Sequence, residues 1–260
     1  MVQYWKNIIS VDFEKMDKEK SIVLLPIAAT EQHGKHLPVG TDSMILEALL
    51  KKFAKEKDMP QGNVVIAPQI WVGKSNEHMS FPGTLTFKAM TLYHMVEELT
   101  DSITAHGFQK IMLVNAHGGN TDLLNLISRD IRIKHKVEVY VFDWWFTSFW
   151  QELLSEKKDS LRPYGVFHAC ELETSLMMEI ARERVDESAI ADETPDGMFE
   201  GKEFVSLFGP ITMGWETKDV TKSGVIGCPV SASAQKGKEM LQYATDKLEK
   251  IVVEVLGFQY

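Results

Sequence analysis

Residues 21–29, SIVLLPIAA, form an unbroken apolar run of strand length. A strand that is apolar on both faces is typical of the interior of a parallel sheet, where helices cover both sides. The run leads into ATEQHGKHLPVGTD (29–42), which carries one glutamate, two histidines and one aspartate. A hydrophobic core would exclude such side chains, and a solvated loop does not need them. The sequence therefore predicts a buried strand whose end opens onto a polar site.

Apolar strands and amphipathic helices continue to alternate up to about residue 150. A helix is predicted from residue 41, because Ile45, Leu49 and Phe53 recur at helical spacing. The remaining strands are predicted at 63–70, 110–116 and 137–144, and the helices between them at 89–107 and 118–136. This alternation predicts an α/β fold with a mostly parallel sheet and helices on both of its faces.

The pattern is less regular after residue 150. Helices are predicted within 170–183 and 231–256, whereas the loop-rich segment 184–224 is left unassigned. We find no internal repeat and no linker that would separate two domains. The sequence therefore predicts a single domain over residues 1–260.

The composition excludes several classes of partner. The 260 residues include 37 acidic and 28 basic ones, which gives a formal net charge of −9, with no basic patch to neutralise phosphates. No apolar run is long enough to span a bilayer, and the charged N-terminus is unlike a secretory signal. Two cysteines are too few for a disulfide framework. These features predict a cytoplasmic protein that acts on a small molecule, without nucleic-acid or membrane partners.

Metal-binding side chains are expected to meet at one edge of the sheet. Glu31 and His33 follow the first strand, His117 follows the strand at 110–116, and Asp42 opens the first helix. Sites in parallel α/β sheets form at the carboxyl ends of strands, and this mixture of ligands suits zinc or manganese. Taken singly, Asp42 is more often a helix N-cap, and NAHGGN (115–120) is an ordinary turn with a packed histidine. Their shared edge favours the metal site.

A second polar cluster, FHACELETS (167–175), begins a predicted helix. Glu171 shares a helical face with Thr174 and Ser175, and a buried carboxylate there would need a cation. Alternatively, Glu171 and Glu173 simply favour the helix dipole in the first turn. The residues alone do not decide between these readings.

Four motifs, EQHGKHLPVGTD, FPGTLTF, NAHGGN and HACELETSLM, resemble in this order those of the creatininase family of metal-dependent amidohydrolases. The resemblance runs from about residue 24 to residue 178. It implies a three-layer α/β/α sandwich with two zinc or manganese ions, and a ring-shaped homo-oligomer, commonly a hexamer. It also implies hydrolysis of a C–N bond in a small cyclic amide.

The resemblance also implies roles for individual residues. Glu31 and His117 would hold one ion, His33 the other, and Asp42 would bridge them, while His168 would transfer protons. Creatininase itself carries a tyrosine and a ligand glutamate where this chain has Gly118 and Gly119. The missing ligand is predicted to be Glu171, because other family members with two glycines have a glutamate at its position.

The pocket for creatinine is not preserved in the sequence. Phe167 replaces a glutamate of creatininase, and Tyr164 replaces its lid tryptophan. The expected reaction is attack by a metal-bridging hydroxide on a cyclic amide or formamide; the alternative is ring opening of a cyclic, polyol-derived ketone at the same centre. A non-catalytic binding protein ranks last, because the candidate ligands and His168 are all present. Asn115 and Asn120 are expected to be structural. Substrate contacts are predicted for His78, Gly118, Gly119, Trp144 and Tyr164.

Overall fold

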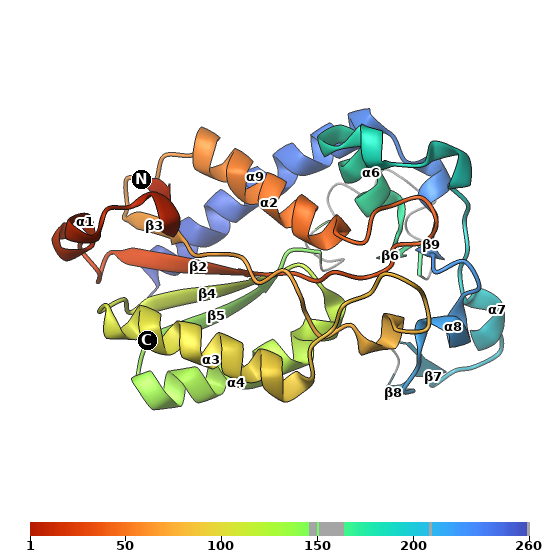
Figure 1. Ribbon diagram of the computed structural model, residues 1–260, viewed down its shortest axis with the longest axis horizontal. Helices are drawn as coiled ribbons and strands as arrows, with labels where there is room; N and C mark the ends of the chain where they lie inside the picture. The colour runs from red at the N-terminus through yellow and green to blue at the C-terminus, as the bar shows by residue number, and fades with distance from the viewer. Residues whose placement is uncertain (146–149, 151–163, 208–209, 259–260) are drawn as a thin grey trace.

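Five parallel strands form the centre of the fold in the computed structural model (Figure 1). The structure describes residues 1–145, 150, 164–207 and 210–258. In the order β1-β3-β2-β4-β5, the most apolar strands occupy the middle, and β2 is buried along its whole length. The strands are β1 (Val2–Tyr4), β2 (Ser21–Ile27), β3 (Asn63–Ile66), β4 (Lys110–Asn115) and β5 (Glu138–Asp143).

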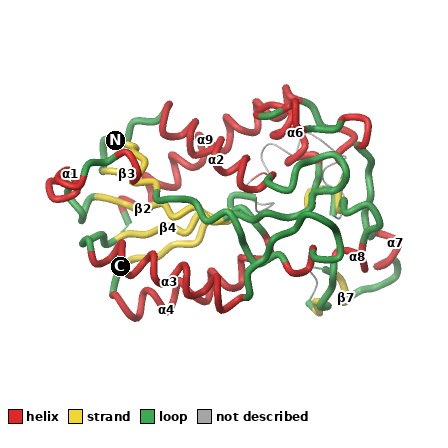
Figure 2. The backbone as a smooth tube through the Cα atoms, viewed as in Figure 1, coloured by secondary structure: helices red, strands yellow, loops and turns green. Residues whose placement is uncertain are grey.

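Helices cover both faces of the sheet, as Figure 2 shows most clearly. One layer consists of α2 (Thr41–Glu56), α6 (Glu171–Ile180) and α9 (Ala234–Gly257), and the other of α3 (Ala89–Ala105) and α4 (Thr121–His135). Alternate residues of β2 serve the two layers: Ile22 and Leu24 pack in one core cluster, and Val23 and Leu25 in the other. The predicted three-layer α/β/α sandwich with a parallel sheet is thereby confirmed.

The edge strand β1 was not predicted. It pairs in parallel with β3, with Val2 opposite Val64, and is followed by the short helix α1 (Ser10–Lys15). Its residues are only partly buried. A three-residue edge strand produces neither an apolar run nor a clear alternation, so its sequence carries no recognisable signal.

The segment that the sequence left unassigned folds across the carboxyl ends of the strands (Figure 1). It contains α7 (Asp196–Phe199), β7 (Val205–Ser206), β8 (Ile211–Thr212) and α8 (Thr217–Val220). Beyond it, β9 (Ile226–Gly227) pairs in antiparallel fashion with β6 (Val166–His168). These elements are too short for periodicity to reveal them, yet they bring new side chains to the predicted site.

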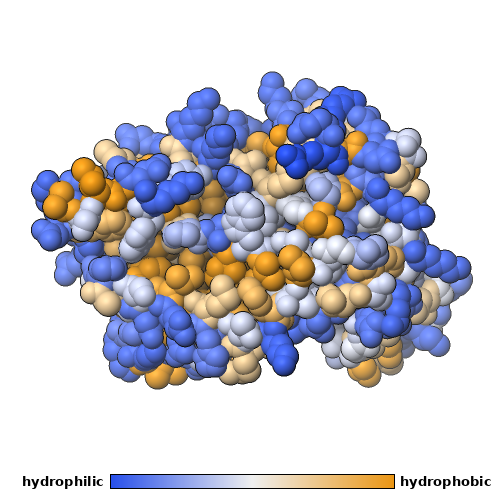
Figure 3. Space-filling model, in the orientation of Figure 1, coloured by the Kyte–Doolittle hydropathy of each residue, from blue (hydrophilic) through white to orange (hydrophobic). Residues whose placement is uncertain are grey.

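The surface is mixed in character. The face seen in Figure 3 has many hydrophilic residues around its rim and a group of apolar ones near its middle. Within the described part of the chain, no helix combines the length and apolar character needed to cross a bilayer. Cys170 and Cys228 are buried and not bonded to each other.

Candidate metal centre

The loops after β2 and β4, with the first turn of α2, bring together four residues that we call the sheet half of the site: Glu31, His33, Asp42 and His117. All four are buried, with at most 5% of each residue exposed. His117 Nδ1 lies 3.1 Å from Glu31 Oε2 and 3.7 Å from Asp42 Oδ2, and His33 Nε2 lies 3.1 Å from Asp42 Oδ1. The predicted meeting of these groups at one sheet edge is what the structure shows.

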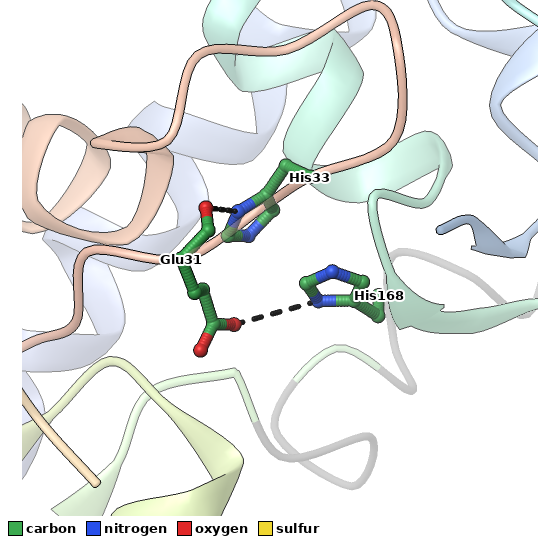
Figure 4. Close-up of side chains that lie close together, drawn as sticks. All are labelled: Glu31, His33 and His168. Atoms are coloured by element: carbon green, nitrogen blue, oxygen red, sulfur yellow. Dashed lines mark hydrogen bonds and ion pairs between the residues drawn. The ribbon is translucent and has the colours of Figure 1, made fainter. Parts of the chain in front are cut away.

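His168 and Glu173, which we call the α6 half, approach from the other side. His168 ends β6, and its Nδ1 lies 3.5 Å from Glu31 Oε1 (Figure 4). Glu173 is the third residue of α6, where one carboxylate oxygen accepts a hydrogen bond from the N–H of Cys170. Its other oxygen lies 3.4 Å from His33 Nε2. Helix capping therefore aims this carboxylate at the sheet half.

Each of the three histidines is fixed by a backbone carbonyl at one ring nitrogen and turns the other toward carboxylates. His33 Nδ1 donates to the carbonyl of Glu31 (3.0 Å), His117 Nε2 to that of Lys74 (3.0 Å), and His168 Nε2 to that of Gln32 (2.7 Å). This second partner is the usual device for orienting a metal-binding imidazole. The other ring nitrogens, His33 Nε2, His117 Nδ1 and His168 Nδ1, therefore point toward the space between the carboxylates.

Three buried atoms in that space make no hydrogen bond of normal geometry with the described residues, although two of them have an ion-pair partner at 3.1 Å: Glu31 Oε2, His33 Nε2 and Asp42 Oδ2. Such atoms are costly unless a cation compensates for their lost hydration. Among the described residues, three overlapping sets of groups lie close enough to hold an ion. Two of them share Asp42, namely Glu31 with Asp42 and His117, and His33 with Asp42 and Glu173; the third is Glu31 with His33 and His168. Nitrogen and carboxylate ligands of this kind fit zinc or manganese.

The electrostatics match a cation site. Burial lowers the pKa of His33 and His117, but Asp42 and Glu31 respectively outweigh it and hold both pKa values well above the ordinary range. Burial raises the pKa of Glu31, yet the surrounding histidines bring it well below its usual value. For His168, burial and the neighbouring His33 lower the pKa strongly. Protons therefore occupy the sheet half, where a metal ion would replace them, while His168 is neutral.

Glu171, the predicted replacement ligand, does not face the centre. Its side chain is buried against Lys236 of α9, with which it forms an ion pair. Glu173 lies beside His33 instead. Residues two apart on a helix point in nearly opposite directions, so only one of the two acids can face the sheet half. The structure thus brings Glu173, and not Glu171, beside His33; position three after the N-cap is the sequence signal that favours this placement of Glu173.

Of the predicted substrate residues, His78 and Gly119 lie beside the candidate ligands, whereas Gly118 lies next to the ring of Trp145. His78 Nε2 lies 3.6 Å from Glu31 Oε1. A Cβ atom at Gly119 would lie 2.4 Å from Glu77 Oε1 and 2.5 Å from His117 Nε2, so this glycine leaves room for both groups. The sequence analysis missed Glu77, whose Oε1 is 3.5 Å from His117 Nε2.

The aromatic predictions fare less well. Trp144 is buried in the core and packs edge-on against Trp150, with ring centroids 5.6 Å apart, instead of lining the centre. Tyr164 belongs to a small aromatic cluster with Phe167 and Phe199 next to β6. A tryptophan at a strand end is as easily absorbed by the core as by a pocket, and the sequence carries no signal that separates the two.

Asn115 and Asn120 have the structural role that was expected. Asn115 donates to the carbonyl of His117 (2.8 Å) and to Asp143 (2.6 Å). Asn120 donates to the carbonyl of Ala28 (3.2 Å). These bonds tie together the loops that carry the sheet half.

Comparison with known proteins places this geometry in context. The family model described as creatininase, creatinine amidohydrolase, matches residues 6–252. A mycofactocin precursor peptide peptidase from Mycolicibacterium smegmatis is 26% identical over 88% of this chain and 85% of its own length. A 3-dehydro-scyllo-inosose hydrolase from Thermotoga maritima is 22% identical over 97% of this chain and 83% of its own. The creatinine amidohydrolase of Pseudomonas putida is 24% identical over 67% of this chain and 70% of its own.

Solved structures agree on the fold. A tryptophan-to-alanine variant of creatininase superposes with a TM-score of 0.79 and 20% identity, covering 98% of this chain and 99% of that one. Creatininase structures described as a manganese form and as a Zn–Zn type have TM-scores of 0.74 and 0.75 at 19% and 20% identity, and each covers 98% of this chain and 99% and 98% of its own.

Proposed function

Because the chain belongs to the creatininase family of hydrolases, we propose that it is a hydrolase with two divalent metal ions that cleaves a C–N bond of a small cyclic amide or formamide. Glu31, Asp42 and His117 would hold one ion, and His33, Asp42 and Glu173 the other. Glu173 takes the place for which the sequence suggested Glu171. The ring-shaped oligomer and the cytoplasmic location stay predictions from the sequence.

One observation carries the proposal: Asp42 belongs to both of the proposed ligand sets, and the buried oxygen Asp42 Oδ2 has no hydrogen-bond partner in the described chain. A carboxylate that is shared in this way is suited to bridge two cations. Divalent ions held there supply an activated water at neutral pH and polarise the carbonyl that is attacked. Backbone carbonyls fix the orientation of His33 and His117 before substrate arrives.

The chain itself contributes proton transfer. His168 Nδ1 faces Glu31 Oε1 at 3.5 Å, and its pKa is lowered by burial and by His33, so a neutral ring is ready to accept a proton. The same nitrogen would then deliver that proton to the leaving nitrogen, which cannot depart as an anion. Replacing His168 with asparagine should keep the metal content and slow turnover by roughly 10²–10⁴-fold, the usual scale for a lost acid–base group.

A second candidate is ring opening of a cyclic, polyol-derived ketone. The observation in its favour is the inosose hydrolase from Thermotoga maritima, whose alignment spans 97% of this chain. The same polarised carbonyl chemistry serves a ketone, but the bond that breaks is then C–C and not C–N. In that case His168 would protonate a carbon leaving group.

The test is metal analysis followed by a substrate panel. Protein purified without chelator should contain close to two zinc or manganese ions per chain. The loaded protein is then assayed with creatinine and other lactams, formamides, short peptides and cyclic polyol ketones. Turnover of amides supports the first candidate and turnover of ketones alone the second. A chain that binds no divalent ion would contradict both.

A further inference from the structure

Gln32 lies between two histidines of the site, His78 and His168, whose ring centroids are 4.4 Å apart. Its side chain is buried, with 4% of the residue exposed. We propose that Gln32 is a positioning residue that sets opposite tautomers in the two rings, so that His78 presents an N–H to the metal centre and His168 a lone pair. The chemical consequence rests on the proposed function, whereas the tautomers themselves do not.

The orientation of the Gln32 amide is fixed by two backbone groups. Its Oε1 accepts a hydrogen bond from the N–H of Gly34 at 2.9 Å, and its Nε2 lies 3.2 Å from the carbonyl oxygen of Gly224. An N–H only donates and a carbonyl only accepts, so the reversed amide would lose both bonds. The Nε2 group therefore faces the histidines with two protons to give.

The tautomer of His168 follows from the backbone of Gln32. His168 Nε2 lies 2.7 Å from the Gln32 carbonyl oxygen, which can only accept. In the neutral ring the proton must then be on Nε2, and the lone pair is on Nδ1. That lone pair faces Glu31 Oε1 at 3.5 Å, an arrangement that favours a cation or a proton between the two atoms.

The tautomer of His78 follows from counting the amide protons. One proton of Gln32 Nε2 goes to the Gly224 carbonyl. His168 Nε2, at 3.0 Å, already carries a proton and cannot accept the second. The second proton therefore goes to His78 Nδ1, 2.9 Å away. This nitrogen must then be unprotonated, with a lone pair that accepts the hydrogen bond. The proton of the neutral His78 ring is then on Nε2, 3.6 Å from Glu31 Oε1.

Thr217 of α8 supplies the competing arrangement. Its hydroxyl donates to the Glu77 carbonyl at 2.9 Å, and its oxygen lies 3.0 Å from His78 Nδ1. Without the amide of Gln32, His78 would protonate Nδ1 and donate to this oxygen. The Gln32 amide alone disfavours this Nδ1-protonated form of His78. In that form the second amide proton would face the N–H groups of both His78 Nδ1 and His168 Nε2. Gln32 is thus the switch between two tautomers that the surroundings would both satisfy.

The chemical consequence is a donor and an acceptor on the same side of the centre. His168 Nδ1 can take up a proton, while His78 Nε2–H can donate a hydrogen bond to the oxygen that becomes negative during attack. If His78 adopted the other tautomer, two lone pairs would face the site and the oxygen would lose a donor. The hydrolase therefore depends on a residue that is neither a metal ligand nor a proton carrier.

The experiment reads the tautomers directly from proton–nitrogen NMR correlations of ¹⁵N-histidine-labelled, metal-free protein. Measurements at about pH 8 lie above the ordinary imidazole pKa, and burial lowers the pKa of both rings further. Spectra of His78→Asn and His168→Asn assign the signals. The wild type should show His78 protonated at Nε2 and His168 at Nε2. In Gln32→Leu, His78 should move its proton to Nδ1.

Two further variants keep the test decisive. Gln32→Glu has the shape of glutamine but only accepts, so it should also place a proton on His78 Nδ1, even if the leucine variant fails to fold. Thr217→Val removes the competing acceptor and should keep the wild-type tautomers. In the loaded enzyme, Gln32→Leu should lower kcat by about 10–100-fold, the scale of a lost orienting partner, with KM and metal content unchanged.

The inference is overturned if His78 carries its proton on Nδ1 in the wild type, or if both Gln32 variants leave the tautomer unchanged. These spectra use protein without metal. Failure of the metal analysis or of the substrate panel would therefore be recognised separately.

Discussion

The two halves of the site are held in place by different kinds of structure. The sheet half sits on loops that leave the central strands β2 and β4, both fully buried. The α6 half depends on β6, which lies outside the five-stranded sheet and, within the described part of the chain, pairs with the two-residue strand β9 alone. The sheet half can be located from the sequence, because sites in parallel α/β sheets form at the carboxyl ends of the strands. The α6 half depends on the pairing of β6 with β9, which lie far apart in the chain. No local sequence pattern predicts that pairing.

The largest effect is expected from Asp42, because it belongs to both of the proposed ligand sets. In Asp42→Ala both groups of ligands lose a member, so bound metal should fall from near two ions per chain to near zero, and activity should be lost with it. Atomic absorption on the purified variant measures this. Ser43→Ala is a matched control, since Ser43 is the next residue of α2 and is also buried, and its hydroxyl donates to the carbonyls of Ala29 (3.0 Å) and Trp71 (3.5 Å) instead of facing the ligands. Retention of both ions in Asp42→Ala would show that neither ligand set needs Asp42 and would refute the bridge.

The next effect distinguishes the two acids of α6. Glu173→Gln should weaken one ion by about 10–100-fold, the scale seen when a metal site loses a well-placed carboxylate partner. Glu171→Gln should leave metal content unchanged and lower the free energy of unfolding by about 1–3 kcal/mol, because the buried carboxylate loses its charged partnership with Lys236. Metal titration and urea unfolding of both variants measure the pair. The reverse pattern would restore Glu171 as the ligand.

Two adjacent glycines provide a finer comparison within the sheet half. A Cβ at Gly119 would lie 2.3 Å from the Lys74 carbonyl and would crowd Glu77 and His117, whereas at Gly118 the nearest contact is the ring of Trp145 at 3.6 Å. Gly119→Ala should therefore cost about 1–3 kcal/mol of unfolding free energy through overpacking. It should also weaken metal binding, while Gly118→Ala changes both little. Equal effects of the two substitutions would show that His117 does not depend on this space.

The smallest effect is a pH dependence of the sheet half. The pKa values of His33 and His117 are raised in the folded, metal-free protein, because Asp42 and Glu31 outweigh burial. Their contribution to stability is fully present below the unfolded pKa of about 6.5 and is lost as pH rises through the raised values. Chelated protein should become easier to unfold in urea as pH rises above about 7. With metal present the trend should reverse, since protons no longer compete for the ligands. A chelated protein whose stability is flat over this range would contradict the raised pKa values.

Much of the fold could be read from the sequence. The strands around Leu24 and Leu113 are apolar on both faces, and this pattern identifies a buried parallel sheet without further information. Once the sheet is placed, Glu31, His33 and His117 must meet, because they follow strands that end at one edge. The edge strand β1 and the short elements after residue 184 were missed, since two or three residues carry no period.

From the residues alone, only the part of the site that follows the strand ends of the sheet could be predicted. His168 was suggested by motif resemblance, and its position depends on Ile226, opposite it in β9. Whether Glu171 or Glu173 faces the sheet half depends on where α6 begins, and a helix end is uncertain by one or two residues when it is read from the sequence. Gln32 lacks a chemical signature of its own. The role that we propose for it depends on His78, His168 and Gly224, which only the folded chain brings next to its side chain.

The pairing of β6 with β9 has a consequence for biosynthesis. The chain emerges from the ribosome N-terminus first, so the strands that carry the sheet half are complete long before Ile226 and Gly227 are made. A nascent chain can gather Glu31, Asp42 and His117 while His168 still lacks its β-strand partner. The strand that supports His168 is thus among the last parts of the site to be made, so the candidate proton carrier would be positioned after the sheet half.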